Sequence, residues 1–124
     1  ISTGFMTERA IDAAEALQKQ GISAGVLHVP PIKPFDSEAV ATFAGGVSHI
    51  ITAENHVVVG GLASLVVETL FDAGIAKTVT RIGLPDRYIE CGAVPTLQAK
   101  YGLTTEAVIA TIAAVAWSVA RGTA

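Results

Sequence analysis

The sequence contains few charged residues for its length. Asp, Glu, Lys and Arg make up 15% of the 124 residues and 51% are hydrophobic, whereas an average soluble domain has about 25% charged residues. The length allows one domain, which buries about two-thirds of the surface of the unfolded chain. A surface with so little charge indicates a domain that covers one face with its own copy or with other domains of a longer chain.

Clusters of basic residues are also missing. The formal net charge is -3 with eight Lys and Arg in total, and no short window holds more than two of them. Binding to nucleic acid depends on such a positive patch. We therefore predict no nucleic-acid partner.

Long apolar runs and cysteines are scarce. The longest apolar stretch, Ala107–Trp117, is interrupted by Thr111 and is shorter than the ~20 residues that span a bilayer. No charged-then-apolar leader with a cleavage site is visible, and the single Cys91 excludes an internal disulfide. Cys91 also lacks a CxxC partner and an electropositive setting, so it is not predicted to be a nucleophile. We expect a cytoplasmic protein with no membrane partner.

Glycine-rich nucleotide-binding patterns are absent as well. Neither the Gly60-Gly61 pair nor the segment Ser2–Thr7 completes G-x-G-x-x-G or G-x-x-x-x-G-K-[ST]. Two free N–H groups at a helix start can still bind an anion. The alternative, which we favour, is that Gly60 and Gly61 let the chain turn tightly and pack close to the sheet.

What the sequence does contain is an alternation of short apolar runs with helical patterns. Helices are expected at Phe5–Gln20, from Asp36 to Gly45, from Gly61 to Gly74, at Pro95–Tyr101 and from Thr104 or Thr105 onward, and strands at Ser23–Val29, at Ile50 and Ile51, and at Thr78–Leu84. Strands and helices that alternate with short connections predict an α/β fold in three layers, a mostly parallel sheet with helices on both faces. The order of the strands stays open.

Individual residues mark where several of these elements begin. Thr7 is expected to cap the first helix, Asp36 the second, and Thr104 or Thr105 the last. Residues Ile1–Gly4 are typical of the last part of a further strand, so we expect residues upstream of Ile1. The last helix is apolar around nearly its whole circumference from Ala107 to Trp117, and such a helix must be covered on more than one side.

The loop after the central strand carries the polar candidates. Glu54, Asn55 and His56 place a carboxylate, an amide and an imidazole at the carboxyl end of a strand, where α/β sheets usually meet ligands and partners. Glu54 and His56 are two residues apart, so an extended backbone points both to one side, as a base and its orienter or as two metal ligands. A third ligand is missing nearby, although His28 ends another strand and can approach. We favour a pair that holds the loop or a subunit contact through hydrogen bonds. His49 is expected far from this edge.

Four segments of the sequence match one family together and in order. They are I-S-T-G-F-M-T-E-R-A from Ile1, P-P-I-K-P-F-D at Pro30–Asp36, T-A-E-N-H-V-V-V-G-G-L-A-S at Thr52–Ser64 and R-I-G-L-P-D-R-Y-I-E-C-G at Arg81–Gly92. This series resembles the C-terminal domain of transketolase-type thiamine diphosphate enzymes, above all of transketolases encoded as two separate halves. The domains of 1-deoxyxylulose-5-phosphate synthase and of 2-oxoacid dehydrogenase β subunits are similar.

The resemblance implies that residues 1–124 are one C-terminal domain that follows two larger domains in a longer enzyme. That enzyme would move a two-carbon ketol unit between sugar phosphates, as in the pentose phosphate pathway, with thiamine diphosphate and Mg²⁺. In the family the first domain holds the diphosphate and Mg²⁺, and the second carries the glutamate that activates the aminopyrimidine ring. We therefore expect no catalytic, cofactor-binding or metal-binding residue in this chain, and no activity of the chain alone.

The resemblance gives one loop a role in assembly. Glu54, Asn55, His56, Gly60 and Gly61 match the loop that in the family lies toward the neighbouring domain and helps to build the dimer. Here E-N-H stands where many relatives have E-E-H. The expected partners are the upstream domains, or a separate N-terminal half, and a second copy of the chain.

Two alternatives stay open. The parent enzyme can be a 1-deoxyxylulose-5-phosphate synthase or the β subunit of a 2-oxoacid dehydrogenase, since L-P-D-R-Y-I-E-C-G also resembles the synthase. A different class of function is an independent regulatory module that binds a small anion at the Gly60-Gly61 helix start.

Overall fold

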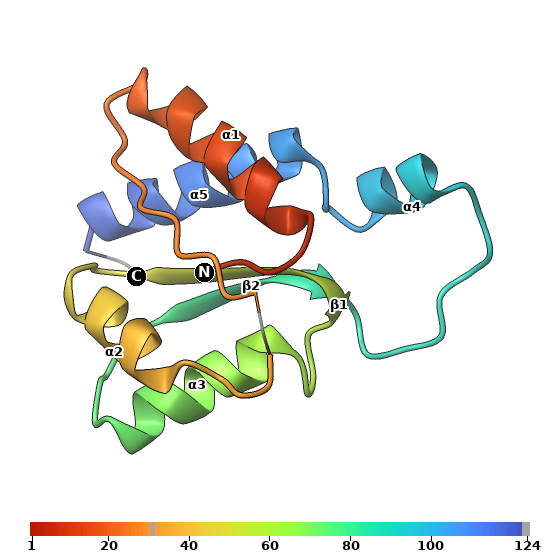
Figure 1. Ribbon diagram of the computed structural model, residues 1–124. Coiled ribbons are helices and arrows are strands. Elements are labelled where there is room, and N and C mark those ends of the chain that lie inside the picture. The colour runs from red at the N-terminus through yellow and green to blue at the C-terminus, as the bar shows by residue number, and fades with distance from the viewer. Residues whose placement is uncertain (31, 123–124) are drawn as a thin grey trace.

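A computed structural model describes residues 1–30 and 32–122 (Figure 1). The elements along the chain are α1 (Met6–Gln18), α2 (Ser37–Gly45), β1 (Ile50–Val57), α3 (Leu62–Asp72), β2 (Val79–Leu84), α4 (Val94–Lys100) and α5 (Thr105–Ala120). Each predicted helix is present within a few residues of its expected bounds. The predicted alternation of helices with extended segments is therefore confirmed. The central strand is longer than predicted, because Glu54, Asn55 and His56, which were expected in the loop after it, lie within β1.

The sheet is parallel and its centre is the pair β1 and β2. Their register runs from Ile50 opposite Val79 to Ala53 opposite Ile82. Ser2 lies on the other side of β1 and forms parallel bridges with both Ala53 and His28. The order across the sheet is thus the segment ending near His28, then Ser2, then β1, then β2, which supplies the strand order that the sequence left open.

The strand predicted at Ser23–Val29 is shorter than expected. Within the described residues it makes a single bridge, at His28, with Ser2. The hydrogen bonds that hold it run from Ser2 N to Leu27 O and from Val29 N to Ser2 O, both at 2.9 Å. Because the segment pairs only through this one bridge to Ser2, it does not form a regular strand.

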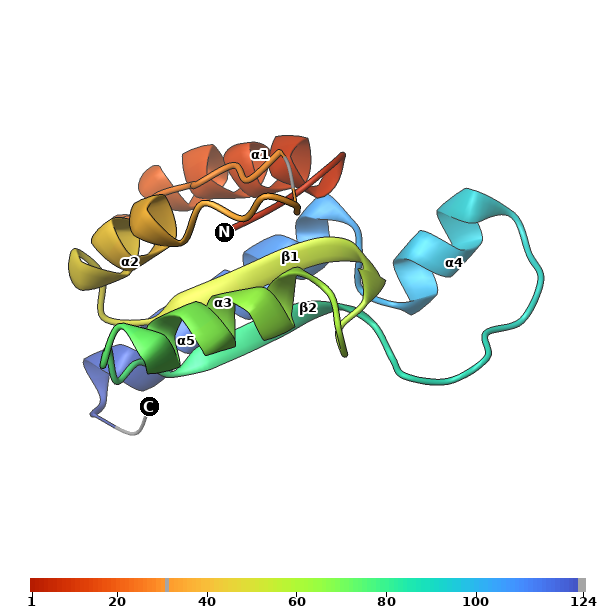
Figure 2. The ribbon, with the colours of Figure 1, turned by 60° about the horizontal axis from the view of Figure 1, so that its bottom comes forward.

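Helices cover both faces of the sheet, as predicted. α1 and α5 lie side by side on one face, and α2 and α3 lie together on the other (Figures 1 and 2). α4 stands apart from both layers at the end of a long loop (Figure 1). The three-layer α/β class expected from the sequence is confirmed.

Each helical layer has its own hydrophobic core against the sheet. The core beneath α2 and α3 consists of eight buried residues, Ile1, Val29, Val40, Ala44, Ile50, Leu62, Val66 and Leu70. The core beneath α1 and α5 consists of six, Met6, Ala13, Ala53, Ile82, Leu103 and Val108. Residues of β1 contribute to both cores, because successive side chains of a strand point to opposite faces.

The predicted caps are correct at two helices and wrong at one. Asp36 Oδ1 accepts a hydrogen bond from Ala39 N at 2.9 Å at the start of α2, and Thr104 Oγ1 accepts one from Ala107 N at 3.3 Å at the start of α5. Thr7 does not cap α1, because that helix already begins at Met6. The Thr7 hydroxyl instead contacts Nδ1 of His28 at 2.7 Å.

Among the residues that the structure describes, one helical stretch, Val94–Ala120, is long and apolar enough to cross a membrane by length and composition alone. Gly102, with φ of 71°, lies in the turn that divides this stretch into α4 and α5. The longer of the two, α5, has 16 residues and is about 24 Å long at ~1.5 Å per residue, less than the ~30 Å hydrocarbon core of a bilayer.

The cap of α2 gives a stability test. We expect Asp36→Ala to lower the free energy of unfolding by about 1 kcal/mol, because the N–H of Ala39 loses its acceptor. Asp36→Asn, which keeps an acceptor oxygen, should stay close to the unchanged protein. Urea unfolding followed by circular dichroism measures both. Equal losses for Ala and Asn would show that the cap bond contributes nothing.

Candidate functional site

The loop between β1 and α3 is organised by the side chain of Glu54. This residue is 1% exposed, although it is a carboxylate. Its Oε2 accepts a hydrogen bond from Leu62 N at 2.7 Å and its Oε1 accepts one from Ala63 N at 2.9 Å. The first N–H groups of a helix have no partner within the helix and carry partial positive charge. The buried side chain of Glu54 therefore supplies hydrogen-bond acceptors for two of the N–H groups at the start of α3.

Two glycines leave room for this carboxylate. A Cβ atom at Gly61 would lie 2.0 Å from Glu54 Oε2, and one at Gly83 of β2 would lie 3.2 Å from Glu54 Cγ. Gly60 has φ of +76°, a backbone conformation that residues with side chains rarely adopt. The geometry favours the interpretation of the Gly60-Gly61 pair as a tight turn with close packing.

The contacts of Glu54 also decide which N–H groups at the start of α3 are free to bind an anion. The N–H groups of Leu62 and Ala63 already donate to Glu54, and Gly60 N donates to Ser64 Oγ at 2.8 Å. The anion that lies at the start of α3 is the protein's own carboxylate. An external anion would have to displace it.

Glu54 and His56 do not form the predicted pair on one side of the strand. Glu54 is buried, whereas His56 is exposed and its Nδ1 contacts Val57 O at 2.9 Å. The ladder between β1 and β2 shifts register between Ala53 and Val57. Such an irregularity breaks the strict alternation of side chains along a strand. It explains why Glu54 and His56, although two residues apart, do not point to the same side. Asn55 is also exposed.

The other two histidines lie in separate places. His28 contacts the Thr7 hydroxyl, and His49 Nε2 contacts Thr80 Oγ1 at 2.9 Å at the start of β1, away from the Glu54 loop. Burial lowers the pKa of His49 below its ordinary value. Within residues 1–30 and 32–122, no three His, Cys, Asp or Glu side chains lie close enough to hold a metal ion.

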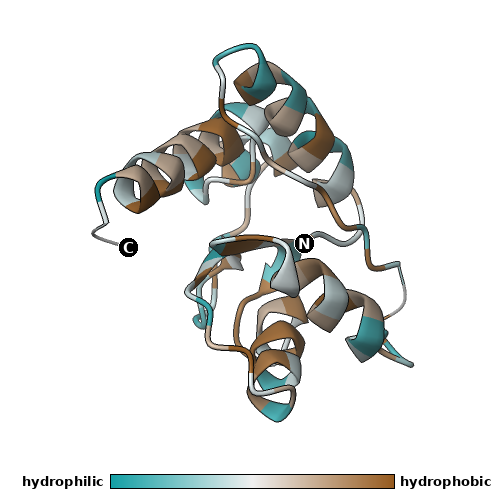
Figure 3. Cartoon of the chain, turned by 90° about the vertical axis from the view of Figure 1, so that its left-hand side faces the viewer, coloured by the Kyte–Doolittle hydropathy of each residue, from teal (hydrophilic) through white to brown (hydrophobic). Residues whose placement is uncertain are grey.

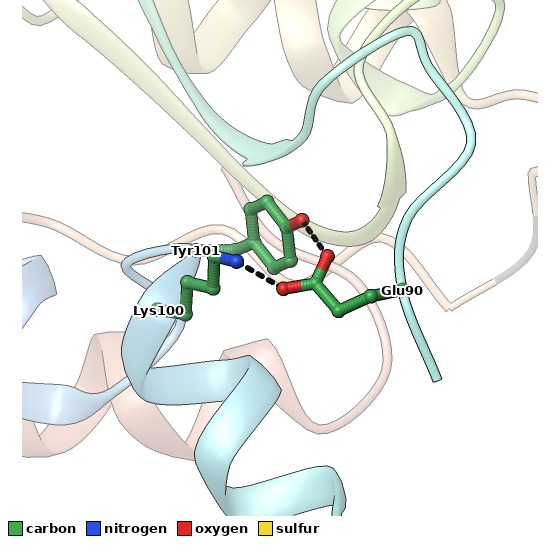
Figure 4. Close-up of polar contacts among 3 residues, drawn as sticks. All are labelled: Glu90, Lys100 and Tyr101. Atoms are coloured by element: carbon green, nitrogen blue, oxygen red, sulfur yellow. Dashed lines mark hydrogen bonds and ion pairs between the residues drawn. The ribbon is translucent and has the colours of Figure 1, made fainter. Parts of the chain in front are cut away.

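Glu90 makes a polar contact that the sequence did not predict. Its carboxylate receives hydrogen bonds from Lys100 Nζ on one oxygen and from Tyr101 OH, at 2.6 Å, on the other (Figure 4). The two donors lie at the end of α4, and Glu90 lies in the loop after β2. The three residues, which we call the Glu90 clamp, fasten this loop to α4. Glu90 and Lys100 are ten positions apart, one in an irregular loop and the other at the end of α4, so periodic spacing gives no signal.

The Glu90 clamp shifts the ionisation of its carboxyl group. The hydrogen bond from Lys100, followed by that from Tyr101, lowers the pKa of Glu90 to about 2. Cys91, next to it, is exposed and free. The clamp is a salt bridge on the surface rather than a buried acid, so it holds geometry more than it supplies stability.

The described residues do not fit thiamine diphosphate and Mg²⁺. A diphosphate site would need free N–H donors, but those at the start of α3 donate to Glu54. A magnesium site would need clustered carboxylates, and the described residues contain no cluster of three potential ligands.

Taken together, the fold and the site define a parallel α/β domain whose carboxyl edge is held by internal hydrogen bonds. Residues 1–108 match the family model of the transketolase C-terminal domain. The chain therefore belongs to the family of transketolase C-terminal domains.

Three relatives illustrate the match. A putative uncharacterized transketolase family protein of Sinorhizobium fredii is 48% identical over 114 residues, which are 90% of this chain and 33% of that protein. A 1-deoxy-D-xylulose-5-phosphate synthase of Methylacidiphilum infernorum is 41% identical over 105 residues, 85% of this chain and 17% of the synthase. A solved structure, a split gene transketolase described as an inactive beta4 tetramer, aligns with a TM-score of 0.78 at 36% identity over 90% of this chain and 35% of that one.

The coverage shows how this chain relates to its relatives. It spans about a third of the Sinorhizobium protein and of the split gene transketolase, and less than a fifth of the synthase. These relatives are thus proteins with further parts beyond the matched domain.

Glu54 can be tested by a conservative substitution. We expect Glu54→Gln to lower the free energy of unfolding by about 1–3 kcal/mol, because the amide accepts one of the two hydrogen bonds and leaves a buried donor unpaired. Glu68→Gln, on the exposed side of α3, is the matched control and should change stability by less than about 0.5 kcal/mol. Urea unfolding measures both variants. Equal stability of Glu54→Gln and the control would remove the role given to Glu54.

The Glu90 clamp predicts a pH dependence. Because the pKa of Glu90 is about 2 in the folded chain and 4.5 ordinarily, the stabilisation by the clamp is complete above pH 4.5 and is lost as the pH falls through about 2. Carbon NMR of the Glu90 carboxyl group should show a midpoint near 2. The double variant Lys100→Met, Tyr101→Phe should return it toward 4.5. A midpoint near 4.5 in the unchanged protein would mean that the clamp does not form in solution.

Proposed function

We propose that this chain is the supporting C-terminal domain of a thiamine diphosphate-dependent enzyme that transfers a two-carbon ketol unit between sugar phosphates. The proposal has three supports. The chain belongs to the transketolase C-terminal domain family, its relatives are transketolase-type proteins much longer than it is, and its described residues do not fit the cofactor. The cofactor, bound elsewhere in the enzyme, supplies the carbanion chemistry. The domain contributes assembly rather than catalysis.

The observation that carries the proposal is the exposure of α5. This helix is apolar along its length (Figure 3), yet of its sixteen residues, all described, only Val108 is fully buried. Trp117 is 67% exposed. A helix that is apolar around its circumference must be covered on more than one side, and within this chain α1 covers one side. The uncovered side suits a contact with another part of the enzyme.

The end of β1 and the loop that follows it offer a second surface for assembly. Asn55, His56 and Val59 are exposed around the fixed Glu54 carboxylate, and Val59 is 56% exposed. Glu54 and Gly61 act from within by holding the loop in shape. We infer that the exposed residues meet a neighbouring domain and that a second copy completes a dimer. The beta4 tetramer of the split gene transketolase, described as inactive, is a precedent for association without activity.

The alternatives differ in their support. A 1-deoxyxylulose-5-phosphate synthase remains a candidate parent because the Methylacidiphilum synthase is 41% identical to this chain, and a 2-oxoacid dehydrogenase β subunit rests on the sequence resemblance alone. An independent anion-binding module has weaker support, because Glu54 already accepts the N–H groups at the start of α3. A cytoplasmic location with neither nucleic acid nor membrane as partner is part of the proposal.

The proposal is tested by activity and association together. The purified chain with thiamine diphosphate and Mg²⁺ should show no ketol transfer, and activity should appear when it is mixed with the remaining part of its parent enzyme. Trp117→Glu should weaken this association about tenfold or more, because it places a charge in an apolar contact. Phe71→Glu is the matched control, since Phe71 is 84% exposed on α3 in the opposite layer.

Two results would overturn the proposal. Ketol transfer by the chain alone would show that it carries a catalytic site. Failure to associate with the remaining part of the enzyme, together with binding of inorganic phosphate in a calorimetric titration, would favour the anion-binding module instead.

A further inference from the structure

Residues 85–100 leave the body of the domain as one excursion, which we call the arm. It consists of the loop after β2 and of α4, and it stands apart from both helical layers (Figure 1). Leu84 and Tyr101, on either side of it, pack against the core beneath α1 and α5. All residues of the arm are described, and none of them is buried. The arm thus starts and ends on the domain without burying a side chain.

Polar contacts hold the arm in one position. The Glu90 clamp ties its loop to Tyr101 (Figure 4), and Arg9 of α1 donates hydrogen bonds to Gln98 Oε1 of α4, at 2.8 Å, and to Leu103 O. Because α4 has only seven residues, it would not be a stable helix in water by itself. The arm is therefore fixed before any partner binds, which lowers the entropic cost of binding.

The exposed side chains of the arm are of the kind that contribute most to protein interfaces. Arg87 and Tyr88 are exposed, Tyr88 completely, and Val94 is 63% exposed. Tyr and Arg are enriched among the residues on which binding energy depends. Exposed connecting segments that a rigid scaffold positions often carry binding sites. An arm with these side chains is suited to contact another protein surface.

The charges of the arm favour an acidic partner. The pKa of Lys100 is raised, above all by the hydrogen bond to Glu90, while Arg87 acts in the opposite direction, so the two cations are close enough to repel each other. Within the described part of the chain, Lys100 pairs with Glu90, and no carboxylate, that of the neighbouring Asp86 included, forms a salt bridge with Arg87. A carboxylate from outside the chain would therefore be attracted to Arg87.

The arm starts beside the surface at the end of β1 that is proposed for assembly. Val58 N donates to Leu84 O at 3.0 Å, so the end of β2 and the residues after β1 are side by side. Asn55, His56 and Val59 therefore lie at the same edge of the sheet as the first residues of the arm. The relatives have parts beyond the matched domain, since this chain covers 33% of the Sinorhizobium protein and 35% of the split gene transketolase. Such a part is the neighbour that this edge would meet.

We propose that the arm docks on the neighbouring part of the parent enzyme, with the Tyr88 ring in an apolar hollow of that part and Arg87 on one of its carboxylates. The proposal rests on the proposed function, because the partner is the rest of that enzyme. It adds a contact separate from that of α5. Tyr88 and Arg87 make this contact, whereas Arg9 and Glu90 are positioning residues that act through the arm.

The arm carries a natural reporter of docking. Cys91 is the single cysteine of the chain, and it is exposed next to Glu90. Its alkylation by iodoacetamide, followed by mass spectrometry of the Cys91 peptide, needs no substitution. When the unchanged chain is mixed with the remaining part of its parent enzyme, we expect alkylation to slow about tenfold or more, because docking removes the exposure on which thiol reactivity depends. Glutathione in the same mixture should react at an unchanged rate.

Substitutions on the arm test the contact itself. Tyr88→Ala and Arg87→Gln should each weaken association with the remaining part of the enzyme about tenfold, because each removes a central side chain of the interface. The matched controls are Phe71→Ala on α3 and Lys19→Gln just after α1, both exposed and outside the arm. They should change the affinity less than about twofold.

Arg9→Met tests the positioning role. It should weaken the association and also speed hydrogen exchange of the α4 amides in the free chain about tenfold, because α4 loses its tie to α1. Tyr88→Ala should leave this exchange unchanged. Gln98→Leu removes the same tie from the side of α4 and takes the place of Arg9→Met if that variant unfolds.

The possible results separate this proposal from the proposed function. If the unchanged chain associates but Cys91 stays as reactive as before, and Tyr88→Ala and Arg87→Gln behave like the controls, the docking arm is wrong and the proposed function stands. Absence of association would overturn both. Slower alkylation in the chain alone, growing with its concentration, would assign the arm to a second copy instead.

Discussion

The carboxylate of Glu54 joins the end of β1 to the first turn of α3, and the shape of the carboxyl edge depends on this contact. A buried carboxylate is costly unless its oxygens are paired, and both oxygens here accept N–H groups at a helix start, where the helix dipole favours negative charge. A side chain at Gly61 would collide with the carboxylate, and one at Gly83 would collide with Val58 Cγ1 and His56 O and crowd Cγ of Glu54. The exposed residues Asn55 and His56 at the end of β1 therefore lie beside a contact that holds the strand and the helix together.

The two helical layers are completed to different degrees. On the α2 and α3 side, the core around Val40, Leu62 and Val66 is fully buried. On the α1 and α5 side, only Val108 of α5 is fully buried, and Trp117 is 67% exposed. Burial of apolar surface is the main favourable term in folding, so a domain with one covered face and one partly open face gains stability from a neighbour. The proposed contact at α5 would cover the open face.

The polar groups at the carboxyl edge hold loops in position. Glu54 fixes the start of α3, the Glu90 clamp ties the loop after β2 to α4, and Arg9 of α1 donates to Gln98 Oε1 of α4 at 2.8 Å. Each of these contacts ends on another group of the same chain. An edge built in this way keeps its surface in one shape for a partner, which agrees with a supporting role in a larger enzyme of the transketolase type.

Local patterns in the sequence predicted the α/β class, the positions of the helices and the cap at Asp36, because hydrophobic spacing and capping are local properties of the chain. They left Thr104 and Thr105 as alternatives for the last cap, of which the structure has Thr104. It also carried the family resemblance through four motifs in order. Only the tertiary structure decided the strand order, the separate fates of Glu54 and His56, and the pairing of Glu90 with Lys100 and Tyr101. These depend on a register shift within the sheet and on loops that bring distant residues together, and a hydrogen bond across space leaves no periodic pattern in the sequence.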